Sequence, residues 1–119
     1  MKLINTKETY DRVYEQTEDP KPVFTLRKLT YGEVASIQDE TSLLDDKNRI
    51  AYLAGTSSRL KIKYALIGWK NVTDEEGKEI SCNDPAKDKL PPIVALWLVR
   101  EIDKLNVLNG ISADESKNS

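Results

Sequence analysis

The sequence predicts a small single domain of the α+β class, mainly helical, with three or so helices and a minor two- or three-stranded β element. A chain of 119 residues is long enough for one core and too short for two ordinary domains. Residues 23–29 are rich in strand formers that can bury one face, and residues 62–69 and 94–105 carry apolar side chains at helical spacing. We therefore expect a flexible N-terminal arm (1–22), one globular domain (23–110) and a flexible C-terminal tail (111–119).

The N-terminal segment is polar and ends in the chain breaker Asp19-Pro20-Lys21-Pro22. Residues 1–20 are thus expected to form either a mobile arm or a short, loosely attached first strand. Residues 23–29 are then predicted as a strand, with Phe24 and Leu26 on one face. Thr30 and Glu33 have the spacing of a capping box, which predicts a helix over residues 31–40 with Val34 and Ile37 turned inward.

The middle of the chain offers weaker signals. Residues 41–48 are rich in turn formers and are expected to form a loop, whereas 49–53 could be a strand or a helical turn. A second helix, capped by Thr56, Ser57 or Ser58, is predicted to continue to Trp69. Its buried stripe would consist of Ile62, Ala65, Leu66 and Trp69, and its basic flank of Arg59, Lys63 and Lys70.

The last third of the chain has clear boundary signals. Residues 72–80 are expected to form a hairpin or an ordered loop around Gly77, and Asn83 or Asp84 can cap a short turn that begins at Pro85. Leu90-Pro91-Pro92 predicts the start of a long helix that ends at Asn109-Gly110. Its buried stripe is expected to be Val94, Leu98, Ile102 and Leu105, with Trp97 beside it.

The composition argues against an enzyme and against a general nucleic-acid binder. The net charge is −2, the pI is near 5.2, and the chain has no histidine, which removes the commonest general base and metal ligand. The acidic turn Asp74-Glu75-Glu76-Gly77 and the neighbouring acids Asp45 and Asp46 are interpreted as solvated turns. We therefore expect no catalytic residues, no metal site and no cofactor.

The expected location is a reducing cytoplasm. The single cysteine, Cys82, cannot form an internal disulfide and is interpreted as an inert thiol. No apolar run in the sequence has the length of a signal-peptide core or of a bilayer span, so we expect a protein that is neither secreted nor bound to a membrane.

The last helix is apolar on more than one face, so it could be fully buried or could also present a surface for a partner or for self-association. The residues expected on that surface are Val94, Trp97, Leu98 and Val99, with Arg59, Lys63 and Lys70 as an electrostatic rim. The same basic residues leave nucleic-acid binding open as an outside alternative.

Three segments together suggest a family: VFTLRKLTYGEVASIQDE (23–40), ALIGWKNVTDEEGKEI (65–80) and LPPIVALWLVREIDKLNVL (90–108). Their order resembles tail assembly chaperone-like proteins of long-tailed bacteriophages and prophages. Members of that family show a strand rich in Leu and Arg that leads into Leu-Thr and a helix. They also show a Gly-Trp pair near the middle of the chain, followed by a turn with an acidic residue and Gly. Their final helix begins with Leu-Pro.

The resemblance implies a non-enzymatic role in the cytoplasm of the bacterial host. Such a protein would bind the tape-measure protein, or other phage tail proteins, during tail assembly and would be absent from the finished virion. Two alternatives stay open: a structural tail or head–tail component that remains in the virion, and a small nucleic-acid-binding regulator.

Overall fold

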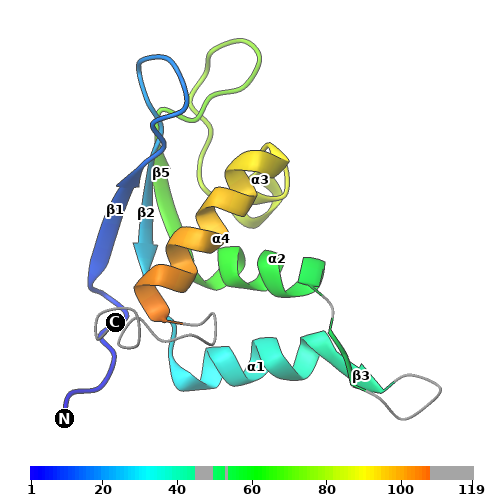
Figure 1. The fold of residues 1–119 in the computed structure, drawn as a ribbon. Helices are drawn as coiled ribbons and strands as arrows, with labels where there is room; N and C mark the ends of the chain where they lie inside the picture. The colour runs from blue at the N-terminus through cyan, green and yellow to red at the C-terminus, as the bar shows by residue number, and fades with distance from the viewer. Residues whose placement is uncertain (45–49, 53, 108–119) are drawn as a thin grey trace, which may run out of the picture.

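The computed structural model of this chain describes residues 1–44, 50–52 and 54–107, and over these residues it is a small α+β domain (Figure 1). The described residues form four helices and two antiparallel sheets. In chain order the elements are β1 (Thr9–Val13), β2 (Val23–Arg27), α1 (Tyr31–Thr41), β3 (Ser42–Leu44), β4 (Ile50–Tyr52), α2 (Ala54–Ala65), β5 (Leu66–Lys70), α3 (Asp84–Lys87) and α4 (Pro92–Asn106).

The larger sheet has the strand order β1-β2-β5, with β2 in the centre. Strand β2 pairs Val23 with Val13 of β1 and Phe24 with Trp69 of β5, and its register with β5 shifts after Thr25. Helix α4 lies across one face of this sheet, and α2 lies between α1 and α4 (Figure 1). The short strands β3 and β4 pair only with each other, so the domain has one main core between the sheet and the helices.

The largest fully buried apolar side chains of the core come from three elements. Phe24 and Leu26 come from β2, Leu66 from β5, and Leu98 and Ile102 from α4, each with at most 1% of its surface exposed. Burial of large apolar side chains is the main favourable term in folding. The sheet and α4 therefore form the part of the domain against which the other helices are arranged.

An aromatic cluster joins the sheet to α4. The Trp97 ring lies 5.1 Å from that of Tyr14 and 5.9 Å from that of Phe24, and Phe24 is in turn 6.2 Å from Trp69 in an edge-on contact. Edge-to-face and tilted arrangements at these distances are the favoured geometries for aromatic pairs. Trp97 is thus mainly a packing residue.

Part of the N-terminal segment, which was expected to be a flexible arm over residues 1–22, pairs with the main sheet. Thr9–Val13 form an edge strand of the sheet, and Tyr14 is buried in the core. The alternative of a short first strand is therefore confirmed. The apolar alternation here is hidden, because Arg12 lies on the half-buried face of the strand and Val13 on the exposed face.

The prediction that the second helix continues to Trp69 is wrong. Helix α2 ends at Ala65, and the next residues form β5, which pairs Leu66 with Leu26 and Trp69 with Phe24. Trp69 keeps a packing role in the strand, and its indole Nε1 donates a hydrogen bond to the carbonyl of Ile80 at 2.6 Å. Four apolar residues satisfy helical spacing in this segment, but pairing with a distant strand decides the conformation.

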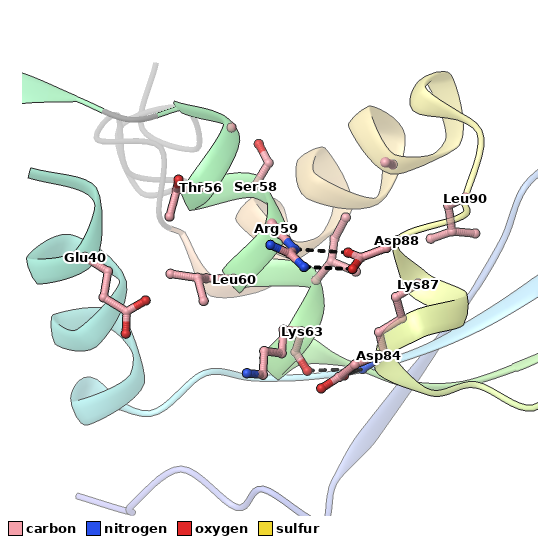
Figure 2. A pocket seen from close by; sticks show the side chains of 13 residues that line it. Glu40, Thr56, Ser58, Arg59, Leu60, Lys63, Asp84, Lys87, Asp88 and Leu90 are labelled. Atoms are coloured by element: carbon pink, nitrogen blue, oxygen red, sulfur yellow. Dashed lines mark hydrogen bonds and ion pairs between the residues drawn. The ribbon is translucent and has the colours of Figure 1, made fainter.

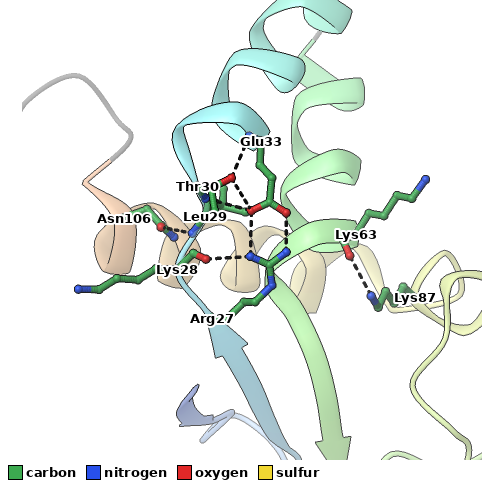
Figure 3. A network of polar contacts seen from close by, with 8 residues as sticks. All are labelled: Arg27, Lys28, Leu29, Thr30, Glu33, Lys63, Lys87 and Asn106. Atoms are coloured by element: carbon green, nitrogen blue, oxygen red, sulfur yellow. Dashed lines mark hydrogen bonds and ion pairs between the residues drawn. The ribbon is translucent and has the colours of Figure 1, made fainter. Parts of the chain in front are cut away.

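The capping box at the start of α1 is confirmed. The Glu33 carboxylate accepts from the Thr30 backbone N–H at 2.9 Å, and the Thr30 hydroxyl accepts from the Glu33 backbone N–H at 3.2 Å (Figure 3). Ile37 is buried as expected, and Val34 packs partly buried against the core. The same carboxylate receives Arg27 from the end of β2, with Nη1 to Oε1 at 2.9 Å, so strand and helix are joined through one acid.

The predicted loop over 41–48 is wrong for its first four residues. Thr41 is the last residue of α1, and Ser42–Leu44 form β3, which pairs with β4. Residues 45–48, including Asp45 and Asp46, lie outside the described residues. For 49–53, the structure selects the strand alternative at Ile50–Tyr52.

The boundaries after β5 follow the sequence closely. Thr73 and Glu79 form an isolated antiparallel bridge around Gly77, which has φ +82°. The Asn83 side chain caps α3 by accepting from the Ala86 N–H at 2.9 Å, as predicted. These turns and caps depend on residues close in sequence, which is why they can be predicted locally.

Helix α4 begins with Pro92 in its first turn, as Leu90-Pro91-Pro92 predicts, and ends at Asn106 rather than at Asn109-Gly110. Val107 ends it in the left-handed region at φ +56°, a conformation unfavourable for a β-branched residue. The Asn106 side chain fixes this end by accepting from the Leu29 N–H at 2.6 Å (Figure 3). Residues 108–119, including the expected tail, lie outside the described residues.

The Arg27–Glu33 pair makes stability depend on pH. Hydrogen bonding from Arg27 lowers the pKa of Glu33 below its ordinary value of 4.5, and the same contact raises the pKa of Arg27. A carboxylate with a depressed folded-state pKa contributes stability above its unfolded pKa and loses it as the pH falls through the folded pKa. We expect Glu33→Gln to lower the free energy of unfolding by about 1–2 kcal/mol at pH 7, because it weakens a charged hydrogen bond.

That deficit should shrink as the pH falls below 4.5, first because the unfolded chain binds the proton and then because folded Glu33 is protonated at its lower pKa. Urea unfolding of both proteins at pH 7 and at pH 3 measures the difference. Glutamine is isosteric and keeps an acceptor for the cap, so a deficit of the same size at both pH values would contradict a role for the charge.

Candidate functional site

A cavity of about 470 Å³ lies over the exposed side of α2. Figure 2 shows α2 between the C-terminal end of α1, which presents Glu40, and α3, which presents Asp84 and Asp88. We call the part of this cavity on the α3 side the α2–α3 cleft. It is lined by Ser58, Arg59, Ile62, Lys63, Asp84, Lys87, Asp88, Leu90 and Ala95.

The floor of the α2–α3 cleft is apolar. Ile62 has 6% of its surface exposed, and Leu90 and Ala95 are partly buried against the same core. Leu90 immediately precedes the two prolines that begin α4, and Ala95 lies in the first turn of that helix. The start of α4 therefore forms the inner surface of the cleft, with α2 and α3 on its two sides.

A bidentate ion pair spans the opening of the cleft. The Arg59 guanidinium donates from Nε to Asp88 Oδ1 at 3.0 Å and from Nη2 to Asp88 Oδ2 at 2.8 Å (Figure 2). The contact lowers the pKa of Asp88 and raises the pKa of Arg59. Both side chains are well exposed, at 72% and 46%, so solvent screens the pair and it holds the two helices together only weakly.

A second polar contact fastens α3 more firmly. Lys87 has only 11% of its side chain exposed, and its ammonium donates to the carbonyl of Lys63 at 3.1 Å while lying 3.5 Å from Asp84 (Figures 2 and 3). This contact caps a carbonyl in the last turn of α2, where a cation is favourable. The short helix α3 is therefore attached to α2 independently of Arg59 and Asp88.

The structure places two of the four residues of the predicted partner surface in the core. Val94 and Leu98 are buried, at 8% and 0% exposure, and Trp97 and Val99 are partly buried. The exposed apolar residues of α4 are Ile93 and Leu96, at 68% and 55%. The buried stripe is confirmed for Val94, Leu98 and Ile102, whereas Leu105 is only partly buried.

The predicted electrostatic rim is divided between two places. Arg59 and Lys63 line the cavity, four residues apart on α2. Lys70 is the last residue of β5, where it pairs with Val23, and it does not line the cavity. The cause is the end of the helix at Ala65, because a residue in the strand no longer follows the helical rotation of Arg59 and Lys63.

Residues of α3 and the start of α4 were missing from the predicted site. Asp84 and Asp88 come to the cleft because α3 packs on α2, and Ala95 comes there because α4 also packs on α2; both contacts join segments more than 20 residues apart. The capping signal at Asn83 predicts where α3 begins in the sequence, but it does not predict which element α3 packs against.

The acidic turn at Asp74 and the thiol of Cys82, which the sequence singles out as chemically interesting groups, both have structural explanations. Asp74 accepts hydrogen bonds from the Glu76 and Lys78 N–H groups at 2.9 and 3.0 Å, so it organises its own turn. Burial raises the pKa of the Cys82 thiol, which favours the unreactive protonated form. Within 1–44, 50–52 and 54–107, no group of three or more potential metal ligands occurs, and no helix is long and apolar enough to cross a bilayer.

Comparisons with known protein families, with curated proteins and with solved structures find no match to this chain. A proposal about function therefore depends on the geometry of the α2–α3 cleft and on the resemblance of the three sequence segments.

Proposed function

We propose that this chain is a non-enzymatic protein-binding domain that acts as a tail assembly chaperone-like protein of a long-tailed phage or prophage. Its client would be the tape-measure protein or another phage tail protein, bound in the cytoplasm of the bacterial host. The observation that carries the proposal is the α2–α3 cleft, in which an apolar floor is flanked by charged side chains from two helices. The sequence resemblance supplies the kind of client.

The cleft suits a peptide segment for two physical reasons. Its floor of Ile62, Leu90 and Ala95 offers apolar surface that gains free energy when it is covered. Its charged side chains lie at the edge, where they can select among partners at little desolvation cost. A tape-measure protein is long and helical, and a small domain that covers its apolar segments would keep it from aggregating before assembly.

Co-expression with the product of a very long neighbouring gene, followed by affinity purification, tests the proposal. We expect the client to co-purify with the tagged chain and to become more soluble in its presence. A folded, tagged chain that neither retains the client nor improves its solubility would rule the proposal out. A second, unrelated helical protein expressed with the same tag serves as the control for non-specific capture.

The same material separates the two alternatives. A structural tail or head–tail component would be present in many copies in purified particles, whereas a chaperone would be absent from them. A nucleic-acid-binding regulator would be retained on DNA in a salt-dependent manner that Arg59→Glu and Lys63→Glu abolish. The Arg59 charge is already paired with Asp88 on the protein itself, which gives this last alternative little support.

A further inference from the structure

The two sides of the α2–α3 cleft carry opposite charges. Helix α2 presents Arg59 and Lys63, and α3 with its C-cap presents Asp84 and Asp88 (Figure 2). Each pair is separated by four residues, so its members lie one helical turn apart on the same side. A basic side therefore faces an acidic side across the apolar floor, and on the acidic side the Lys87 ammonium lies 3.5 Å from Asp84.

The spacing of the cleft residues matches that of a helix surface. Ser58 and Ile62 continue the same four-residue repeat along the inner side of α2. Rows of side chains four residues apart form the ridges and grooves by which helices pack on one another. A segment that binds as an added strand would need a free strand edge, and the lining of this cleft comes from three helices and the connection between α3 and α4.

The Arg59–Asp88 pair can open at little cost. Both side chains are exposed, and the pair is screened by solvent, so breaking it loses little. Lys87 keeps α3 attached to α2 through the Lys63 carbonyl, so the helices need not separate when Arg59 moves aside. An entering segment that offers a carboxylate to Arg59 and a cation to Asp88 replaces one ion pair by two.

We propose that the α2–α3 cleft receives an amphipathic helix of the client, with carboxylates along the flank facing α2 and amines or guanidinium groups along the flank facing α3. The inference rests on the proposed function and defines the chemistry of the segment that the cleft recognises. The order of the two charged flanks also fixes the direction in which the helix lies. Helix α2 spans ~18 Å at 1.5 Å per residue, so a client segment of roughly 12–16 residues covers its length.

Two fluorescein-labelled peptides of identical composition test this chemistry. Both carry leucines at helical spacing. The segregated peptide has glutamates along one flank and lysines along the other, whereas the mixed peptide alternates the two on both flanks. Fluorescence anisotropy with the wild-type chain should give binding of the segregated peptide roughly threefold tighter, the effect of the one exposed ion pair gained when two pairs replace Arg59–Asp88. The preference should fall as salt is raised.

Variants locate the binding on the chain. Ala95→Arg and Ser58→Arg fill the cleft from α4 and from α2, and each should abolish the preference, provided that thermal unfolding shows the variant to be folded. Leu96→Arg changes an exposed residue on the outer face of α4 and should leave the preference intact. Using two filling variants from different helices keeps the test valid if one of them fails to fold.

Three results would overturn the inference: no binding of either peptide, equal binding of both, or a preference that survives both filling variants. The proposed function has its own test in the co-purification of the tape-measure candidate. If the client co-purifies and the peptides fail, only the inference about the cleft falls. If the client does not co-purify, the proposed function falls whatever the peptides do.

Discussion

Leu98→Ala is expected to lower the free energy of unfolding by about 3 kcal/mol, because truncating a buried leucine loses transfer free energy and leaves a cavity. Leu98 has none of its surface exposed and lies in the middle of α4, the helix that crosses the main sheet. Urea unfolding followed by circular dichroism measures the change.

Leu96→Ala is the matched control for this prediction. It makes the same chemical change two residues away on the same helix, where 55% of the side chain is exposed. We expect an effect within about 0.5 kcal/mol, since alanine loses little packing there and has the higher helix propensity. Equal effects of the two substitutions would mean that α4 is rotated relative to the sheet, and that Leu98 belongs to a partner surface after all.

The parts of the fold that the sequence predicts are those decided by near neighbours. Thr30 with Glu33, Asn83 before Pro85, and Leu90-Pro91-Pro92 each act within a few residues, and each marks a helix start where the structure has one. The buried stripe of α4 is equally local, since a single period of 3.6 residues explains Val94 through Ile102.

The parts that the sequence does not predict depend on distant pairing. Leu66 and Trp69 continue the apolar spacing of α2, yet they form a strand because β2 offers them a partner some 40 residues earlier. Gly68 and β-branched Ile67 were the available hints, since both are poor helix residues. For β1, Arg12 on the half-buried face and Val13 on the exposed face hide the alternation, and only the pairing with β2 reveals the strand.

The candidate site contains residues that local sequence patterns group together and residues that only the packing of distant elements brings together. Arg59 and Lys63 could be grouped from the sequence because they share one helix face. Asp88, which completes the opening of the cleft, lies 29 residues from Arg59 and on a different helix. A site built between elements can be predicted from sequence only after the arrangement of those elements is known.

Lys61→Met is expected to be the most destabilising change of a charged residue, at roughly 3–5 kcal/mol, because it leaves a largely buried carboxylate without its cation. Lys61 of α2 lies 2.8 Å from Asp103 of α4, and their side chains are only 14% and 16% exposed. Asp103 Oδ1 accepts no well-aligned hydrogen bond within the described residues, so the nearby Lys61 ammonium is the main group that offsets the cost of burying its charge.

The double variant Lys61→Met with Asp103→Leu should recover most of that loss, since two apolar side chains of similar size can replace a buried ion pair with little penalty.

Arg59→Met provides the control on the same helix: its partner Asp88 is solvated, so we expect almost no change in stability. Chemical denaturation of the two single variants, the double variant and the control measures these differences. If the double variant were no more stable than Lys61→Met, the loss would come from the packing of the lysine stem and not from an uncompensated charge. The contrast between the two pairs matters for function, because the buried contact between α2 and α4 can stay in place while the weak exposed pair at the cleft opens.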